Sequence, residues 1–467
     1  MSGRRGLLSA SAALVASRAL SLLAGLGAVA AVSRSLGPVE FGALSFALAL
    51  AALFAPLTEM GLNAILVRAI LKAPGREGEY AGTALLARLG AGAVALGLGG
   101  AAILVLKPDE PGLHLAAFVL LAGETFRAFQ VCALAMEARR RFTAIAAGQA
   151  GVAILFAGGR AAAALSGAGM VGIAAIHAAE IAAGGMLFLA LRRRGGAPPL
   201  APSRRAAGEL LRRSWILALS AGFATANLKI DQVMLGQMRG TAEVGVYAAA
   251  ARLSELWHFV PAMVATAAFP DLAELRDRDR GAYLGAVRGL LDRIALLSWA
   301  AMAAIALGAG LAVGIAFGPD YAAAAPVLQL HVAGGIFMAL RVVASKWMVI
   351  EELFALSLLS HGLGAALNVA LNLALIPACG PMGAAAATVA SYAGAGWIAF
   401  YAHAGTRPLA HAMGRSLLVP LRLPGIVLRR ARRGAGAGTQ GGTQGGAHGG
   451  AGNGAGDGAG TGAGPDR

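Results

Sequence analysis

Six basic side chains fall inside long apolar segments of this sequence. They are Arg18, Arg88, Arg127, Lys229, Arg252 and Arg341. A Lys or Arg at the centre of a membrane-spanning helix costs about 2.5–3.5 kcal/mol, so such residues usually face a cavity and mark a substrate or ion pathway. We expect a cavity-facing role for the four deeper residues, Arg18, Arg127, Lys229 and Arg252. Arg88 and Arg341 lie near the inner surface, where snorkelling to the interface also accounts for them.

Some of these cations have an acidic neighbour in the sequence. Two acids lie three residues from an arginine, in the pairs Glu124–Arg127 and Arg252–Glu255. Residues three apart share one helix face, so each pair is either a neutralised structural pair or part of a charged site. Lys229 and Asp231 are two apart and project from separate faces. At least one of these two therefore needs a partner on another helix or in a substrate.

The arginines among these residues can make planar, two-pronged contacts to phosphate oxygens, which lysine cannot match. Cations in both halves of the chain therefore suit a substrate with a pyrophosphate or another acidic head group. The candidate substrate-binding residues are Arg18, Arg127, Lys229, Asp231, Arg252 and Glu255. No catalytic, cofactor-binding or metal-binding residues are predicted, and Cys132 and Cys379 lack the neighbours of a metal site.

The composition is that of a membrane protein. Of the 467 residues, 58% are hydrophobic and 13% are charged, and the mean hydropathy is +0.69. A soluble domain usually carries about 25% charged residues. The net charge of +16 is concentrated between apolar segments, so it indicates membrane topology and not nucleic-acid binding.

Apolar segments of about 20 residues, long enough to span a bilayer, recur about twelve times. They lie near residues 10–33, 42–66, 82–106, 113–136, 143–165, 169–191, 214–236, 243–269, 293–317, 324–349, 353–376 and 382–403. With the N-terminus inside, an even number of spans returns the C-terminus inside, and most of the 39 basic residues then lie inside. We place only four in outer loops: Arg34, Lys107, Arg160 and Arg239.

A hexapeptide pattern, Gly-x-x-Glu-[Phe/Val]-Gly, occurs at residues 37–42 and again at residues 240–245. Each copy follows the first span of a six-span half, and its glycines are expected to shape a tight outer turn. Because each half has an even number of spans, the repeat is parallel. The sequence therefore predicts an all-α polytopic membrane protein with two parallel-repeat six-helix bundles.

Composition also divides the chain into segments. We expect an N-terminal bundle at 1–191, a basic cytoplasmic linker at 192–213, a C-terminal bundle at 214–404, a basic juxtamembrane segment at 405–433 and a disordered Gly/Ala-rich tail at 434–467. The juxtamembrane segment suits the anionic inner membrane surface. The tail has almost nothing to bury.

The run from Ser35 to Gly42 resembles the Wzx-type polysaccharide flippases of the MOP (MATE-like) exporter superfamily. So do the stretches 231–236, 243–247 and 250–253, and the resemblance covers roughly residues 10–404. It implies two six-helix bundles around a V-shaped cavity, with alternating access between the two sides. By position, the residues carried over to the head-group site are Arg18, Lys229, Asp231 and Arg252.

The resemblance implies a function without covalent chemistry. The expected cargo is a polyprenyl-pyrophosphate-linked oligosaccharide, flipped from the inner to the outer leaflet of the bacterial cytoplasmic membrane for cell-surface polysaccharide such as lipopolysaccharide O-antigen. The expected partners are the bilayer and other polysaccharide assembly proteins, without nucleic acid. Coupling to H⁺ or Na⁺ is possible. The alternatives are a cation-coupled multidrug antiporter, a lipid II flippase and a membrane glycan polymerase or glycosyltransferase.

Overall fold

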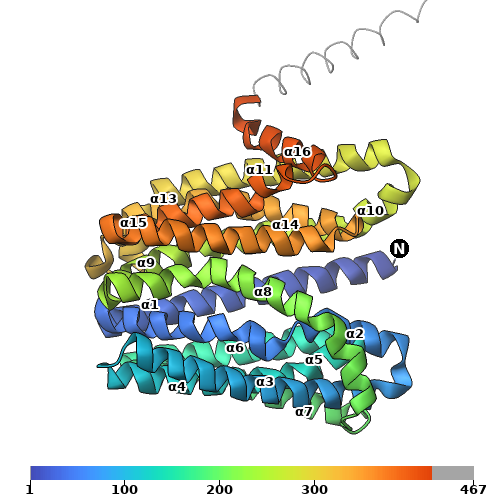
Figure 1. Ribbon diagram of the computed structural model, residues 1–467, viewed down its shortest axis with the longest axis horizontal. Coiled ribbons are helices and arrows are strands. Elements are labelled where there is room, and N and C mark those ends of the chain that lie inside the picture. The colour runs from blue at the N-terminus through green and yellow to red at the C-terminus, as the bar shows by residue number, and fades with distance from the viewer. Residues whose placement is uncertain (1, 423–467) are drawn as a thin grey trace, which may run out of the picture. The chain divides into compact units, whose positions relative to one another are not determined.

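The computed structural model describes residues 2–422, with the side chains of 2–19, 213 and 354 left out of the description. The predicted tail at 434–467 and the end of the basic segment at 405–433 lie outside the described residues. Residues up to Leu417 form one compact unit, to which the following description applies (Figure 1). Every regular element in the described part is a helix.

The helices divide into two sets. The first set is α1 (Ser2–Glu59), α2 (Leu62–Lys72), α3 (Glu77–Leu106), α4 (Pro111–Thr125), α5 (Val131–Ala138), α6 (Phe142–Leu165) and α7 (Met170–Arg194). The second set is α8 (Arg204–Met238), α9 (Thr241–Glu255), α10 (Phe259–Arg278), α11 (Arg280–Leu307), α12 (Ala309–Ala316), α13 (Ala324–His331), α14 (Gly335–Ile350), α15 (Phe354–Gly396) and α16 (Arg407–Leu417). Figure 1 shows the two sets as two bundles.

All twelve predicted spans fall on helices. α1 holds the first two and breaks at Gly37 (φ 69°, ψ 173°), while α15 holds the last two and breaks at Gly380 (φ 52°, ψ −129°). By length and composition, eight described helical segments could cross a membrane, and the segments at 20–72 and 355–401 each contain two predicted spans. The predicted all-α polytopic fold is therefore confirmed.

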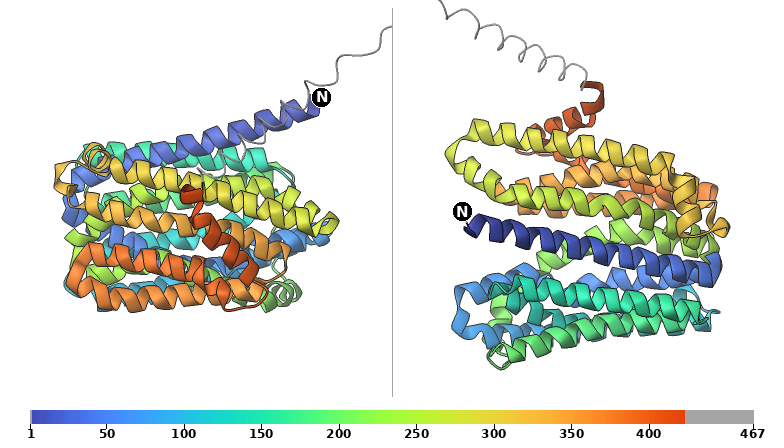
Figure 2. Two further views of the ribbon diagram at one scale, coloured as in Figure 1. Left: turned by 90° about the horizontal axis from the view of Figure 1, so that it is seen from above. Right: turned by 180° about the vertical axis from the view of Figure 1, so that it is seen from behind.

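The seam between the bundles is built around α1. Figure 1 and the right view of Figure 2 show its first part between the two sets of helices. α1 packs against α6 on one side and against α8 and α9 on the other. A side chain on α1 can therefore face either bundle or the space between them.

The segment predicted as a linker, residues 192–213, is mostly helical at its ends. α7 continues to Arg194 and α8 begins at Arg204. The first turns of α8 pack on the first bundle, because Ala206 and Leu210 share one apolar face that is buried with Leu66 of α2. α8 thus starts on one bundle and continues into the other.

Polar contacts hold this connection to α3. The buried Glu77 carboxylate accepts from Arg139 at 2.6 Å and from Arg192 at 3.2 Å. At the start of α8, Glu209 accepts from the Tyr80 hydroxyl at 2.6 Å and from Arg76 at 3.1 Å. These two hydrogen bonds, Tyr80 first, lower the pKa of the Glu209 carboxyl.

Candidate functional site

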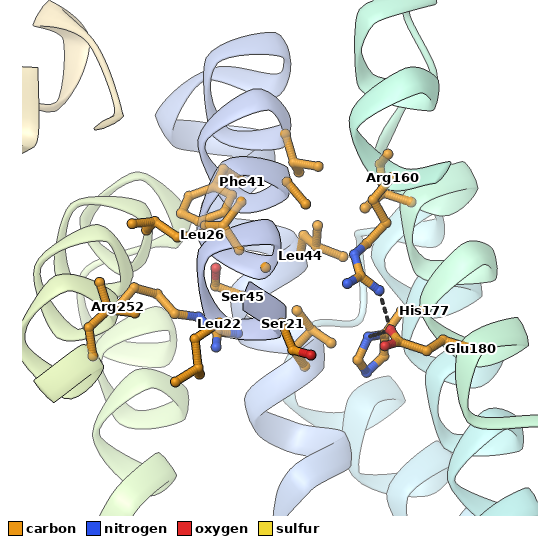
Figure 3. A pocket seen from close by; sticks show the side chains of 17 residues that line it. Ser21, Leu22, Leu26, Phe41, Leu44, Ser45, Arg160, His177, Glu180 and Arg252 are labelled. Atoms are coloured by element: carbon orange, nitrogen blue, oxygen red, sulfur yellow. Dashed lines mark hydrogen bonds and ion pairs between the residues drawn. The ribbon is translucent and has the colours of Figure 1, made fainter. Parts of the chain in front are cut away.

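A cavity of about 310 Å³ opens at the seam between α1, α6, α7 and α9 (Figure 3). Its α1 wall is mostly apolar and includes Leu22, Leu26 and Leu44. The polar groups converge from the other three helices. They are Arg160 of α6, His177 and Glu180 of α7 and Arg252 of α9. A mostly apolar cavity with a few convergent charges is typical of a ligand site.

A second cavity, of about 170 Å³, adjoins the first. The two share Ser45, Leu48, His177 and Arg252 as lining residues. The charged residues that line only the second are Glu124, Arg127, Lys229 and Glu255. Four of the six predicted binding residues, namely Arg127, Lys229, Arg252 and Glu255, therefore meet at one place although they come from both bundles.

Arg127 and Glu124 form the predicted pair. The guanidinium donates to both carboxylate oxygens, one of them at 3.0 Å. Glu124 is 5% exposed and lies near the end of α4, while Arg127 lies in the 3-10 turn that follows. The positive charge of Arg127 is thus largely balanced before any ligand enters.

The predicted pairing of Arg252 with Glu255 is not formed. Glu255 instead lies 3.9 Å from the ammonium of Lys229 on α8. Glu255 ends α9, where the chain enters a 3-10 turn, and its side chain reaches across to α8. This contact agrees with the expectation that at least one of Lys229 and Asp231 has a partner on another helix. Arg252 is left without an ion pair among the described residues.

Arg160 was expected in an outer loop, and this expectation is wrong. The span predicted at 143–165 already contains this residue, and the structure agrees with the span: Arg160 lies within α6 and points into the cavity (Figure 3). It forms an ion pair with Glu180 of α7, and His177 lies 3.8 Å from the same carboxylate. Glu180 and His177 lie inside the predicted span 169–191, but no spacing in the sequence joins them to Arg160.

Asp231 does not line the two cavities. It is 2% exposed and accepts hydrogen bonds from the hydroxyls of Tyr247 on α9 and Thr388 on α15, the latter at 3.1 Å. The prediction that Asp231 contacts substrate in the cavity therefore does not fit this position. The expectation that Asp231 and Lys229 have separate partners is confirmed.

The Asp231 cluster continues through the second bundle. Ser391 donates to the Thr388 carbonyl at 2.9 Å, and Asn368 donates to Ser391 at 3.0 Å. Asn372 in turn donates to Asn368 at 2.8 Å. The side-chain oxygens of Asn227 and Asn372 are buried without a hydrogen-bond partner among the described residues. Buried polar atoms of this kind normally have partners, so these two oxygens call for an explanation.

Arg88 and Arg341 do not snorkel. Arg88 is fully buried and donates to Asn63 at 2.6 Å. Arg341 is 7% exposed and donates to Ser360 at 3.0 Å and to the Ala395 carbonyl. Both guanidinium groups therefore donate to hydrogen-bond acceptors on neighbouring helices and do not extend to the membrane–water interface. The side chain of Arg18 lies outside the described residues; its backbone is helical and one turn before Leu22 of the cavity wall.

The two hexapeptide copies lie against each other at the end of the seam. Gly37 and Gly240 have similar conformations, φ 69° and 95° with ψ 173° and 170°, a region essentially restricted to glycine. This fits the predicted turn. A Cβ on Gly42 would lie 1.7 Å from the Thr241 carbonyl oxygen, and one on Gly245 would lie 2.2 Å from that of Pro38. The last glycines of the two copies therefore allow backbone contact between the bundles.

Further contacts close the same end. The ring of Phe41 lies 6.2 Å from that of Phe317 and 5.9 Å from that of Tyr321. The Tyr321 hydroxyl donates to the Ser33 carbonyl at 2.9 Å, and Arg34 donates to the Ile315 carbonyl at the end of α12. These residues belong to different halves, so this end of the seam is a continuous contact.

Two packed helical bundles around a charged seam form a fold that is also seen in solved membrane transporters. The fold is similar to the lipid II flippase MurJ in an inward closed conformation, with a TM-score of 0.63 and 11% identity over 87% of this chain and 90% of that one. It is also similar to a multidrug resistance MATE family transporter, inward-facing, with a TM-score of 0.62 and 18% identity over 85% and 96% of the two chains. At these identities the likeness concerns the fold.

A family model for polysaccharide biosynthesis proteins matches residues 7–276, and the chain belongs to that family. The resemblance to the polysaccharide flippase family, which rested on the residues around the hexapeptides, is thus confirmed. A curated relative, the probable flippase AglR of Haloferax volcanii, is 33% identical over 173 residues. This match covers 35% of each chain, so it spans about a third of that relative's length.

Proposed function

We propose that this protein is a flippase that moves a polyprenyl-pyrophosphate-linked oligosaccharide from the inner to the outer leaflet of the bacterial cytoplasmic membrane. The family and the partial match to a probable flippase support this proposal. The cargo would feed cell-surface polysaccharide biosynthesis, including O-antigen. No bond is made or broken, and both termini lie in the cytoplasm. The two bundles, residues 1–191 and 214–404, act as the moving halves.

One observation carries the proposal. Three cations of the seam cavities, Arg127, Arg160 and Lys229, each have a carboxylate partner, whereas Arg252 has none among the described residues. Arg252 is exposed and lines both cavities. Its free guanidinium can therefore bind a diphosphate with two parallel hydrogen bonds. The apolar α1 wall accepts the first isoprene units of the carrier, while the remaining tail stays in lipid.

The direction of transport follows from which end of the seam opens. In this structure the Gly42–Gly245 crossing closes one end, which we assign to the outer side by the distribution of basic residues. Cargo enters from the inner side, and separation of the two hexapeptides opens the outer side. Rigid-body rocking of the bundles, typical of transporters built from repeats, is sufficient for this step.

Proteoliposomes that contain a fluorescent polyprenyl-pyrophosphate oligosaccharide test the proposal. We expect Arg252→Ala to slow flipping about 100-fold, because a charge-assisted contact of about 1.5–3 kcal/mol is lost. Arg252→Lys retains the positive charge but not the two-pronged geometry of the guanidinium. Its flipping rate should therefore lie between those of wild type and Arg252→Ala. Lys72→Ala, an exposed residue at the end of α2, is the matched control. The proposal is contradicted if Arg252→Ala flips the cargo at the wild-type rate, or if the folded wild-type protein does not flip it at all.

The Asp231 cluster favours coupling to a cation. Oxygen ligands suit a hard cation. Asn372 is linked to Asp231 through hydrogen bonds of Asn368, Ser391 and Thr388, and Asn227 lies one helical turn before Asp231 on α8. We propose that Na⁺ or H⁺ binds here and drives transport. Asp231→Asn should remove the dependence of flipping on the ion gradient, whereas Asp320→Asn, in an exposed loop, should not. Ion-driven efflux of a cationic dye without any flipping would instead favour a multidrug antiporter.

A further inference from the structure

A basic hollow lies between α11 and α16, away from the seam cavities, and the transport mechanism above does not use it. It measures about 710 Å³. α11 contributes Arg288 and Asp292, and α16 contributes His411, Arg415 and Ser416. Two of these five side chains are arginines and a third is a histidine, so the hollow is suited to an anion.

α16 has the features of a helix that lies at a membrane interface. Leu409, Ala410 and Met413 are buried against the second bundle, while His411 and Arg415, four residues apart, share an exposed face. Two indoles anchor this helix from neighbouring elements. They are Trp299, which donates to the Leu417 carbonyl at 3.0 Å, and Trp397, which donates to the Ala410 carbonyl at 3.0 Å. Tryptophan is enriched at the level of lipid head groups.

The charges in the hollow leave a positive excess. Ser416 donates to the Asp292 carboxylate at 2.7 Å, which keeps this acid against α16. Asp292 can balance one of the two arginines. Arg288 is exposed and has no ion pair among the described residues. The excess therefore matches the single negative charge of a phosphodiester.

The α11 wall changes from charged to apolar along one face. Arg288, Asp292 and Leu296 follow at intervals of four residues, and Leu296 is 38% exposed. A molecule seated at the arginines would have its phosphate beside Arg288 and its hydrocarbon beside Leu296. Basic pockets between helices at the cytoplasmic side of a membrane bind anionic head groups in this way. We propose that this hollow binds an anionic phospholipid of the inner leaflet through its phosphodiester.

Native mass spectrometry of the full chain, released from micelles doped with phosphatidylglycerol, tests this site. We expect Arg288→Gln/Arg415→Gln to weaken retention of the lipid about ten-fold or more, since each basic residue adds to the affinity for an anionic lipid. The matched control is Arg293→Gln/Arg407→Gln. It removes the same charge from exposed positions on the same two helices, and neither residue lines the hollow.

The outcomes separate the possible ligands. Retention of phosphatidylglycerol that falls in the site variant but not in the control supports the proposal. Equal loss in both variants, equal retention of phosphatidylcholine, or competition by soluble glycerol 3-phosphate at similar concentration would overturn it. Size-exclusion profiles and helical circular dichroism must match wild type in both variants. Because the site lies away from the seam, lipid binding and flipping can fail independently.

Discussion

At the scale of single residues, the seam cavities show how a membrane protein can hold several cations in its interior by pairing them with carboxylates. Three of the four cations that line them are held by carboxylates on the same or a neighbouring helix. Partners of this kind offset the desolvation of a buried charge. Among the described lining cations, Arg252 alone has no carboxylate partner, so under the proposed function the contact to an acidic head group depends on it.

Loss of the Glu180 carboxylate should destabilise the first bundle. Glu180→Gln leaves Arg160, whose side chain is 16% exposed, without its partner. An uncompensated charge of this kind costs about 3–5 kcal/mol when fully buried, and about half of that is expected beside a hydrated cavity. Thermal unfolding in detergent should show a clearly lower midpoint.

Two further variants isolate this effect. Glu243→Gln breaks the Arg239–Glu243 pair, whose side chains are 42% and 29% exposed, and should change stability by less than about 1 kcal/mol. Arg160→Gln/Glu180→Gln removes both charges and should recover much of the stability lost in Glu180→Gln. An unchanged midpoint for Glu180→Gln would show that the ion pair has no structural role.

At the scale of elements, sequence patterns within one helix predicted the structure well, whereas contacts between helices could not be predicted. Apolar length placed the predicted spans on helices, and the three-residue spacing placed Arg127 beside Glu124, because both depend on one helix at a time. The Arg160–Glu180 pair joins two helices, so its formation depends on how α6 packs on α7. The spacing rule failed for Glu255 because Lys229 on α8 lies close enough to compete with Arg252.

The hexapeptide shows the same limit. The first glycines of its copies were predicted as turn residues, and their positive φ angles agree with this. The contact between the last glycines could not be predicted, since it requires α1 and α9 to cross beside each other. A repeated sequence pattern thus indicated equivalent positions without indicating that they meet.

Gly42→Ala should weaken closure at this crossing. The new methyl group would overlap the Thr241 carbonyl, and overpacking of this kind costs about 1–3 kcal/mol. A cysteine at Ser45, which lines both seam cavities, reports opening when an impermeant maleimide is added outside whole cells. The parent protein carries Ser45→Cys with Cys132→Ala and Cys379→Ser, because the exposed Cys379 would otherwise react. Labelling should rise about ten-fold, since each 1.4 kcal/mol changes an equilibrium ten-fold.

Gly97→Ala is the control for this experiment. Gly97 lies in α3, and a Cβ there would meet no atom within 4 Å. Labelling in this variant should equal that of the parent protein. If Gly42→Ala also labels like the parent, the crossing does not determine access from outside.

At the scale of the whole molecule, two bundles meet along α1 and are joined by α8, which starts on one and ends in the other. Motion of one bundle against the other must therefore separate contacts at the seam while α8 bends or tilts. The residues proposed to bind cargo and the glycines of the hexapeptide crossing lie on the same helices, α1 and α9. Binding and closure can influence each other through these two helices.

The most direct test of this account is to lock the outer end of the seam. Arg34 and Ile315 are exposed, come from different halves and are in contact through the Arg34 guanidinium. Arg34→Cys/Ile315→Cys, made with Cys132→Ala and Cys379→Ser, can be joined by a short, reducible bis-maleimide linker, and flipping is then measured in proteoliposomes. We predict that flipping stops on cross-linking and returns on reduction. Undiminished flipping by fully cross-linked protein would contradict alternating access through this seam.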